Sequence, residues 1–147
     1  MLRTCKTEGF LGEGQQVKGF LTEHKDTPWE RGQHDCVLFI QKYTSEVWGK
    51  PYAEPEDYPF HDFKTAVKAL FRICRDSNVK TFEGVLDKYY YRTSFPVEGG
   101  IVAKPDTEGL TGYSYGVCHD GYGYFVGENG LVLYELNPLT DLFWSID

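Results

Sequence analysis

A chain of 147 residues is long enough for one domain with one hydrophobic core. Its formal net charge of −7 excludes a general nucleic-acid binder, because such a protein needs a basic patch to neutralise phosphates. No apolar run reaches the length of about 18 residues that a membrane span needs, and no apolar signal region follows Met1. We therefore expect a soluble protein that is made in the cytoplasm and has no membrane partner.

The four cysteines are scattered along the sequence and form no C-x-x-C pair. They indicate neither a zinc site nor a redox pair, so we expect no metal, no cofactor and four reduced thiols. The aromatic content is high, with 10 Phe, 11 Tyr and 3 Trp in a single domain. Some Tyr and Trp side chains should therefore lie at the surface, where they serve binding interfaces well.

The first 14 residues hold three glycines and no periodic apolar pattern. This predicts an irregular N-terminal arm over residues 1–14, followed by a single domain over residues 15–147. A short amphipathic helix is expected over residues 15–24, and its apolar face carries Val17, Phe20, Leu21 and His24. We expect His24 to be a half-buried surface residue rather than a ligand.

The stretch that runs from Asp35 into an apolar segment predicts the start of a helix over residues 36–48. The Asp35 carboxylate is placed to accept the free backbone N–H groups of the first turn, and Cys36 would lie in that turn. The helix dipole favours the thiolate there, as a cysteine nucleophile requires. The structural alternative is a buried cysteine in a well-capped helix. The residue types alone favour that alternative, because free cysteine is among the most buried residues.

Apolar residues surround the first turns of this helix, which is typical of a helix buried in the core. The polar residues 41–46 should then approach the surface before Gly49 and Pro51 end the helix. Two more helices are expected over residues 62–75 and 81–89. The first of these has an apolar stripe that should face the core, made of Phe63, Val67, Leu70, Phe71 and Cys74.

The second half of the chain holds short β-branched and aromatic runs separated by glycine-rich turns. The pair Asn129-Gly130 is the strongest hairpin signal among these turns. Helices followed by antiparallel strands predict an α+β fold in which the helices pack on one face of a sheet. The expected strands span residues 90–95, 101–103, 113–119, 123–126, 131–136 and 143–146.

Two sets of motifs together carry a resemblance to a known family. The first is the loop Trp29-Glu30-Arg31-Gly32-Gln33-His34-Asp35-Cys36. The second comprises the C-terminal segments Gly116-Val117, Gly127-Glu128-Asn129-Gly130-Leu131 and Phe143-Trp144-Ser145-Ile146. Over residues 15–147 the chain resembles a small family of uncharacterised phage proteins related to the NlpC-type cysteine peptidases, which hydrolyse peptidoglycan stem peptides. The resemblance implies a papain-like α+β fold, with N-terminal helices packed on a C-terminal antiparallel sheet.

The resemblance also implies a nucleophile at Cys36 and a general-base histidine on the strand that faces it. Ser114 occupies the place of that histidine, and a serine does not act as a general base near neutral pH. His119 is the best substitute, although its odd offset from Ser114 places it on the other strand face unless a bulge intervenes. His34 is too close to Cys36 in the sequence for good geometry, and nothing ties His61 to the thiol. The implied catalytic residues are thus Cys36 and His119, in an incomplete triad.

The missing histidine favours a role without catalysis. We expect a structural component of a phage virion, in its tail or connector region, with other virion proteins as partners. The alternative is a cysteine peptidase or amidase that cleaves peptidoglycan during phage entry, with Cys36 as nucleophile and His119 as base. A third hypothesis is a small regulatory protein that acts in the host cytoplasm.

Overall fold

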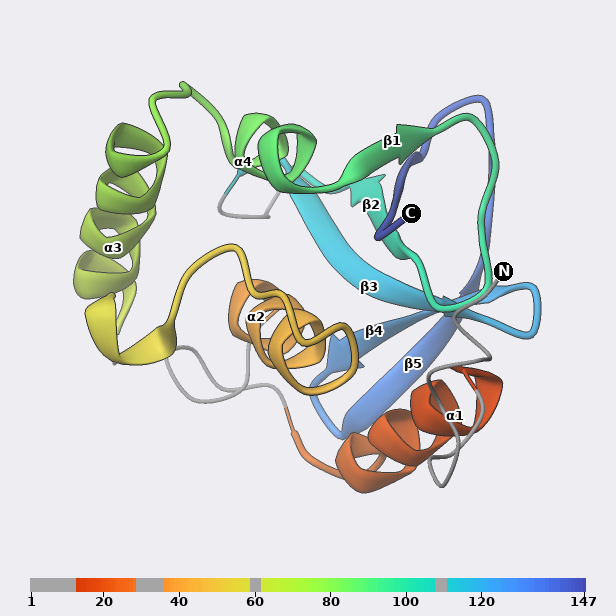
Figure 1. Ribbon diagram of the computed structural model, residues 1–147. Coiled ribbons are helices and arrows are strands. Elements are labelled where there is room, and N and C mark those ends of the chain that lie inside the picture. Colours follow the sequence, from red (N-terminus) through yellow and green to blue (C-terminus); the bar gives the residue numbers. More distant parts are fainter. Residues whose placement is uncertain (1–12, 29–35, 59–61, 108–110) are drawn as a thin grey trace.

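The computed structural model describes residues 13–28, 36–58, 62–107 and 111–147. In these ranges four α-helices come first along the chain and six strands follow, so the predicted α+β class is confirmed (Figure 1). No helix in the described ranges is long and apolar enough to cross a membrane. The helices are α1 (Glu13–His24), α2 (Cys36–Glu46), α3 (Phe63–Asp76) and α4 (Phe82–Tyr89), and an unpredicted 3-10 helix spans Pro55–Asp57.

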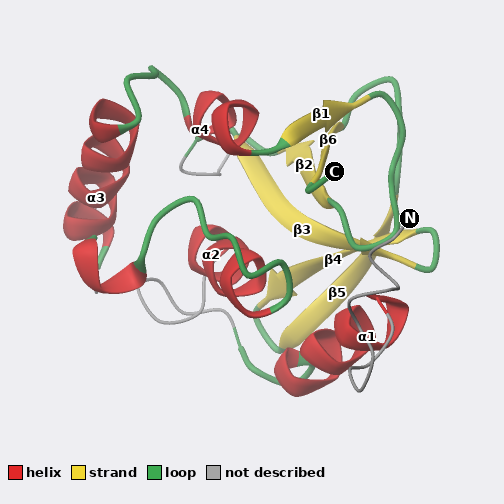
Figure 2. Ribbon diagram, viewed as in Figure 1, coloured by secondary structure: helices red, strands yellow, loops and turns green. Residues whose placement is uncertain are grey.

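The six strands form one sheet in the order β1-β6-β2-β3-β4-β5, and each neighbouring pair is antiparallel. The last strand therefore lies between the first two, while the other strands follow one another as hairpins (Figure 2). The strands are β1 (Tyr91–Thr93), β2 (Ile101–Pro105), β3 (Tyr113–His119), β4 (Tyr122–Gly127), β5 (Gly130–Glu135) and β6 (Leu142–Ser145). The predicted hairpin at Asn129-Gly130 is confirmed, because Gly130 pairs with Gly127 at the tip of β4 and β5.

The main core lies between the helices and one face of the sheet. Side chains from all four helices join alternate strand residues there, including Ile101, Tyr115, Val117 and Trp144. Strand residues between these point to the opposite face, where Val102, Cys118, Phe125 and Phe143 form a small second cluster with Leu136. The expected packing of the helices on one sheet face is thus confirmed.

Helix α2 is the most deeply buried of the four helices, as predicted, but its polar end approaches the surface only in part, because Glu46 is exposed whereas Gln41 and Thr44 are buried. Gln41 is 2% exposed and its Nε2 donates to the Ala53 carbonyl at 2.8 Å. Thr44 is fully buried, and its hydroxyl donates to the Gln41 carbonyl at 3.1 Å. The segment after α2 folds back over this end, where the Ala53 carbonyl accepts from Gln41 and the Lys50 backbone N–H donates to the Thr44 carbonyl at 3.0 Å. The helix also ends at Glu46, two residues before the predicted end.

The predicted core stripe of α3 is wrong at Phe71, whose exposed fraction is 71%. Cys74 is buried as predicted and Leu70 is partly buried against the main core, and Ala66, Ala69 and Ile73 complete the buried face. The Phe63 side chain lies outside the described part of the structure. The two small alanines let α3 approach its neighbours closely. The largest apolar side chain is left on the solvent side, where apolar side chains are common.

We expect Phe71→Gln to change the free energy of unfolding by less than about 0.5 kcal/mol, because the ring leaves little water on folding. Ile73→Ala in the same helix should cost about 2–5 kcal/mol, since Ile73 is only 3% exposed. Urea unfolding monitored by circular dichroism measures both values. A larger loss at position 71 than at position 73 would place the core on the originally predicted stripe.

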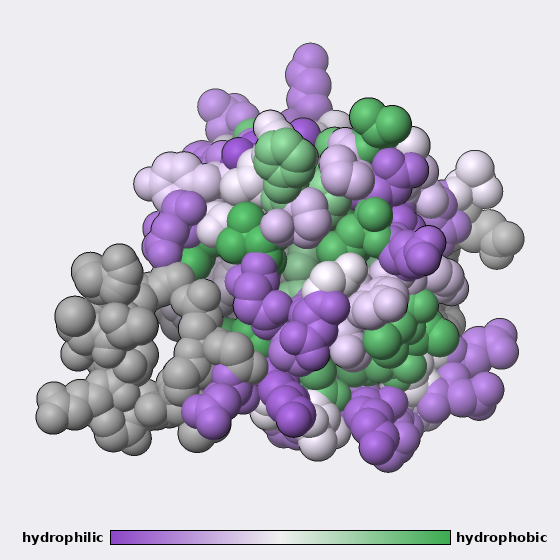
Figure 3. Space-filling model, turned by 90° about the vertical axis from the view of Figure 1, so that its right-hand side faces the viewer, coloured by the Kyte–Doolittle hydropathy of each residue, from purple (hydrophilic) through white to green (hydrophobic). Residues whose placement is uncertain are grey.

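Several aromatic side chains lie at the surface, as the composition predicts. The exposed fractions of Tyr91, Tyr122 and Tyr134 are 63%, 45% and 51%, and that of Phe95 is 68%. Figure 3 shows one face of the molecule, on which apolar side chains gather in separate patches between hydrophilic ones. Trp144, in contrast, is fully buried.

Candidate functional site

Cys36 is the first residue of α2, as the sequence predicts, and its side chain is half-buried against the main core. Helix α2 packs on β3, so the thiol faces the strand that the resemblance singled out. Tyr115 of β3 lies close enough to Cys36 for the two groups to interact electrostatically. Burial and a hydrogen bond to Glu83 raise the pKa of Tyr115, and the nearby Cys36 adds to this rise.

Tyr115 is held in place by polar and aromatic neighbours. Its hydroxyl donates to the Glu83 carboxylate and lies 2.9 Å from the Thr111 hydroxyl. The Phe82 ring packs edge-on against the Tyr115 ring, with the centroids 4.9 Å apart. The Tyr115 phenol near Cys36 is thus bound to a carboxylate, and a neutral phenol does not stabilise a thiolate as a protonated histidine does.

His119 lies at the other end of β3. It shares the helix-facing side of the strand with Tyr115, but it is four residues further along, a distance of about 13 Å in an extended strand. Its Nδ1 is 2.6 Å from Glu98 Oε2, and its ring packs on Tyr124 with the centroids 5.6 Å apart. Glu98 also accepts the Asp120 backbone N–H at 3.0 Å. His119 thus braces the turn after β3, and the structure does not bring it to Cys36.

Ser114, at the position expected for the base, points to the sheet face opposite α2. It pairs across the strands with Lys104, and its hydroxyl donates to Asp106 Oδ2 at 2.6 Å. The odd offset between Ser114 and His119 therefore separates them as predicted. It is Ser114, rather than His119, that faces away from the helices.

The predicted loop before Cys36, residues 29–35, lies outside the described residues, and so does His61. The loop residues Trp29, His34 and Asp35 are therefore not described. The two described histidines are His24 and His119. His24 was expected at the surface, but it is only 9% exposed, because the Phe20 and Phe39 rings cover it. Burial lowers the pKa of His24.

No disulfide joins the described cysteines, which are Cys36, Cys74 and Cys118. Burial raises the pKa of Cys74 and raises that of Cys118 to about 12. Cys5 lies outside the described residues.

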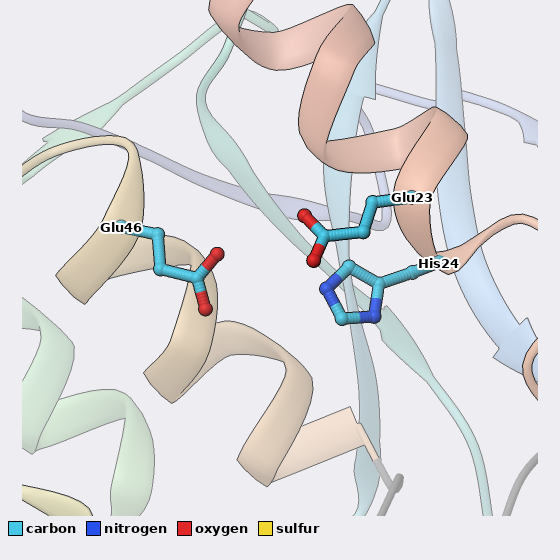
Figure 4. A group of neighbouring side chains, drawn as sticks. All are labelled: Glu23, His24 and Glu46. Atoms are coloured by element: carbon cyan, nitrogen blue, oxygen red, sulfur yellow. The ribbon is translucent and has the colours of Figure 1, made fainter.

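The sequence did not reveal two groups of side chains of the types that bind metals. Glu23, His24 and Glu46 converge where the last turns of α1 and α2 meet (Figure 4). A second group, Glu98, His119 and Asp120, lies at the turn after β3. The only sequence signal for the first group is the Glu23-His24 pair, because Glu46 comes from a different helix.

The fold and the site define an α+β domain in which a half-buried cysteine starts the central helix and lies near a tyrosine on the sheet. The family model described as a domain of unknown function (DUF6950) matches residues 13–145, and the chain belongs to this family. A comparison with curated proteins gave no match.

Proposed function

We propose that this protein is a non-enzymatic structural component of a phage virion, in the tail or connector region, built on a papain-like, NlpC-type domain. The proposal that the protein is not an enzyme rests on the identity of the β3 residue near Cys36. Papain-like hydrolysis needs a base within hydrogen-bond reach of the thiol. The β3 residue near Cys36 is Tyr115, and its phenol, which is hydrogen-bonded to Glu83, is a poor general base near neutral pH.

The exposed aromatic side chains support a role in assembly. Tyr91, Phe95, Tyr122 and Tyr134 keep about half or more of their surface in water, although burial would favour folding. Tyrosine and phenylalanine are enriched at protein interfaces, because they bury a large area while losing few side-chain rotations. Neighbouring virion proteins would cover these rings in the particle.

Purified virions of the phage that encodes this chain test the location directly. We expect mass spectrometry to find the protein in gradient-purified particles at a fixed ratio to known tail proteins, and a high-salt wash to leave that ratio unchanged. Recovery of the protein only from the soluble lysate, with particles that lack it, would contradict the proposal and favour a regulatory protein.

The reactivity of the cysteines tests the absence of an activated thiolate. We expect iodoacetamide near pH 6.5 to alkylate Cys36 no faster than about ten times the rate of free cysteine, whose pKa is about 8.5. Cys74 and Cys118 should react more slowly, because they are buried and their pKa values are raised. Peptide mass spectrometry gives each rate, and labelling in urea provides the control in which all thiols react alike. Selective rapid alkylation of Cys36 would support the peptidase instead.

A further inference from the structure

Three side chains that commonly bind metals meet between α1 and α2, away from Cys36. Glu23 and His24 end α1, and Glu46 ends α2. One ligand atom from each residue lies within 4.8 Å of the other two. Figure 4 shows the imidazole and both carboxylates turned towards the space between the helices.

The His24 ring is fixed in this orientation by aromatic packing. Its centroid lies 4.5 Å from that of Phe20 and 6.0 Å from that of Phe39, with the Phe39 ring edge-on. Its Nε2 is buried and points towards the two carboxylates. A nitrogen ligand that is held before the metal arrives costs little entropy to order, as a preorganised site requires.

The two glutamates are exposed and have side chains long enough to adjust. Bonds of about 2.0–2.2 Å to nitrogen and oxygen place the ligands of a tetrahedral zinc ion about 3.4 Å apart. The observed spread of up to 4.8 Å therefore closes with small rotations of Glu23 and Glu46. Lys42 of α2 also lies near this group. Its positive charge acts electrostatically on the His24 ring, together with the negative charges of Glu23 and Glu46.

We propose that Glu23, His24 and Glu46 form a site for a divalent metal ion of the zinc type. One imidazole and two carboxylates suit zinc and its transition-metal neighbours better than Ca²⁺ or Mg²⁺, which prefer oxygen ligands alone. The ion relieves the repulsion between the two carboxylates and ties the end of α1 to the end of α2. This role is independent of the virion proposal, since it does not involve Cys36 or the exposed aromatic side chains.

Isothermal titration of the full chain with Zn²⁺ tests the site. We expect one saturable site whose affinity falls by at least about tenfold in Glu23→Gln and in Glu46→Gln, because each variant removes one of three ligands. Both residues are exposed, so these variants keep the fold. Glu54→Gln removes an exposed charge elsewhere and should leave the affinity within about twofold.

Two further measurements separate this site from other zinc ligands in the chain. Glu98→Gln alters the second ligating group and should leave the Zn²⁺ affinity unchanged. Co²⁺ bound at the proposed site should show no thiolate charge-transfer absorption, because all three ligands carry nitrogen or oxygen. Zn²⁺ should also raise the melting temperature of the wild type, through preferential binding to the folded state, but not that of Glu46→Gln. Lack of saturable binding, or binding that Glu23→Gln and Glu46→Gln leave intact, would overturn the proposal.

Discussion

Trp144→Ala is expected to lower the free energy of unfolding by about 3–5 kcal/mol. Trp144 is fully buried at the centre of β6, between β1 and β2. Its Nε1 donates to Asp87 Oδ1 at 2.9 Å, and the Arg92 guanidinium lies 4.9 Å from the ring centroid. The substitution therefore opens a cavity in the main core and removes a hydrogen bond between the sheet and α4.

Urea unfolding of wild type and variant measures this loss. Tyr134→Ala provides the control, because Tyr134 is 51% exposed on the edge strand β5 and should cost less than about 1 kcal/mol. Similar losses at both positions would mean that β6 does not organise the core. The corresponding expectation for Trp29 concerns a residue outside the described part of the chain.

Gly130→Ala is expected to cost about 2–4 kcal/mol, through backbone strain and a steric clash together. The backbone φ of Gly130 is +124°, and an added Cβ would lie 2.3 Å from the Lys25 carbonyl oxygen. That oxygen accepts the Leu131 N–H at 2.9 Å, so relief of the clash would also break a hydrogen bond between β5 and the segment after α1.

Gly121→Ala separates the two causes, because Gly121 has a φ of +83° but open space around an added Cβ. We expect it to cost about 1–2 kcal/mol, from the left-handed conformation alone. Thermal unfolding of both variants provides the comparison. Equal losses at positions 121 and 130 would show that the contact between Gly130 and Lys25 does not constrain the fold.

The strands were predicted to within about two residues at each end, because alternation and turn residues act locally. β3 spans residues 113–119 in both the prediction and the structure. The starts of α3 and α4 could also be predicted from the local sequence, because the side chains of Asp62 and Thr81 cap these helices. These features depend on residues near one another in the sequence.

The errors concern contacts between distant segments. Gln41 is buried because the Ala53 carbonyl meets its amide, and no local pattern specifies that contact. The exposure of Phe71 depends on how closely Ala66 and Ala69 let α3 approach its neighbours.

The candidate sites likewise combine features that the local sequence predicts with contacts that it does not specify. The sequence placed Cys36 at the start of a helix, since the helix signal is local. It did not reveal that Tyr115 lies near the thiol, or that Glu46 joins Glu23 and His24, because helix packing decides both arrangements.

We propose that Cys36 starts a structural helix and does not act as a nucleophile. The most direct measurement is the release of soluble fragments from purified peptidoglycan by the wild-type protein and by Cys36→Ser, followed by chromatography. We predict no release by the wild type above the level of the Cys36→Ser protein. Release by the wild type that Cys36→Ser abolishes, while its circular dichroism and melting temperature stay unchanged, would contradict the account and identify a cysteine peptidase or amidase.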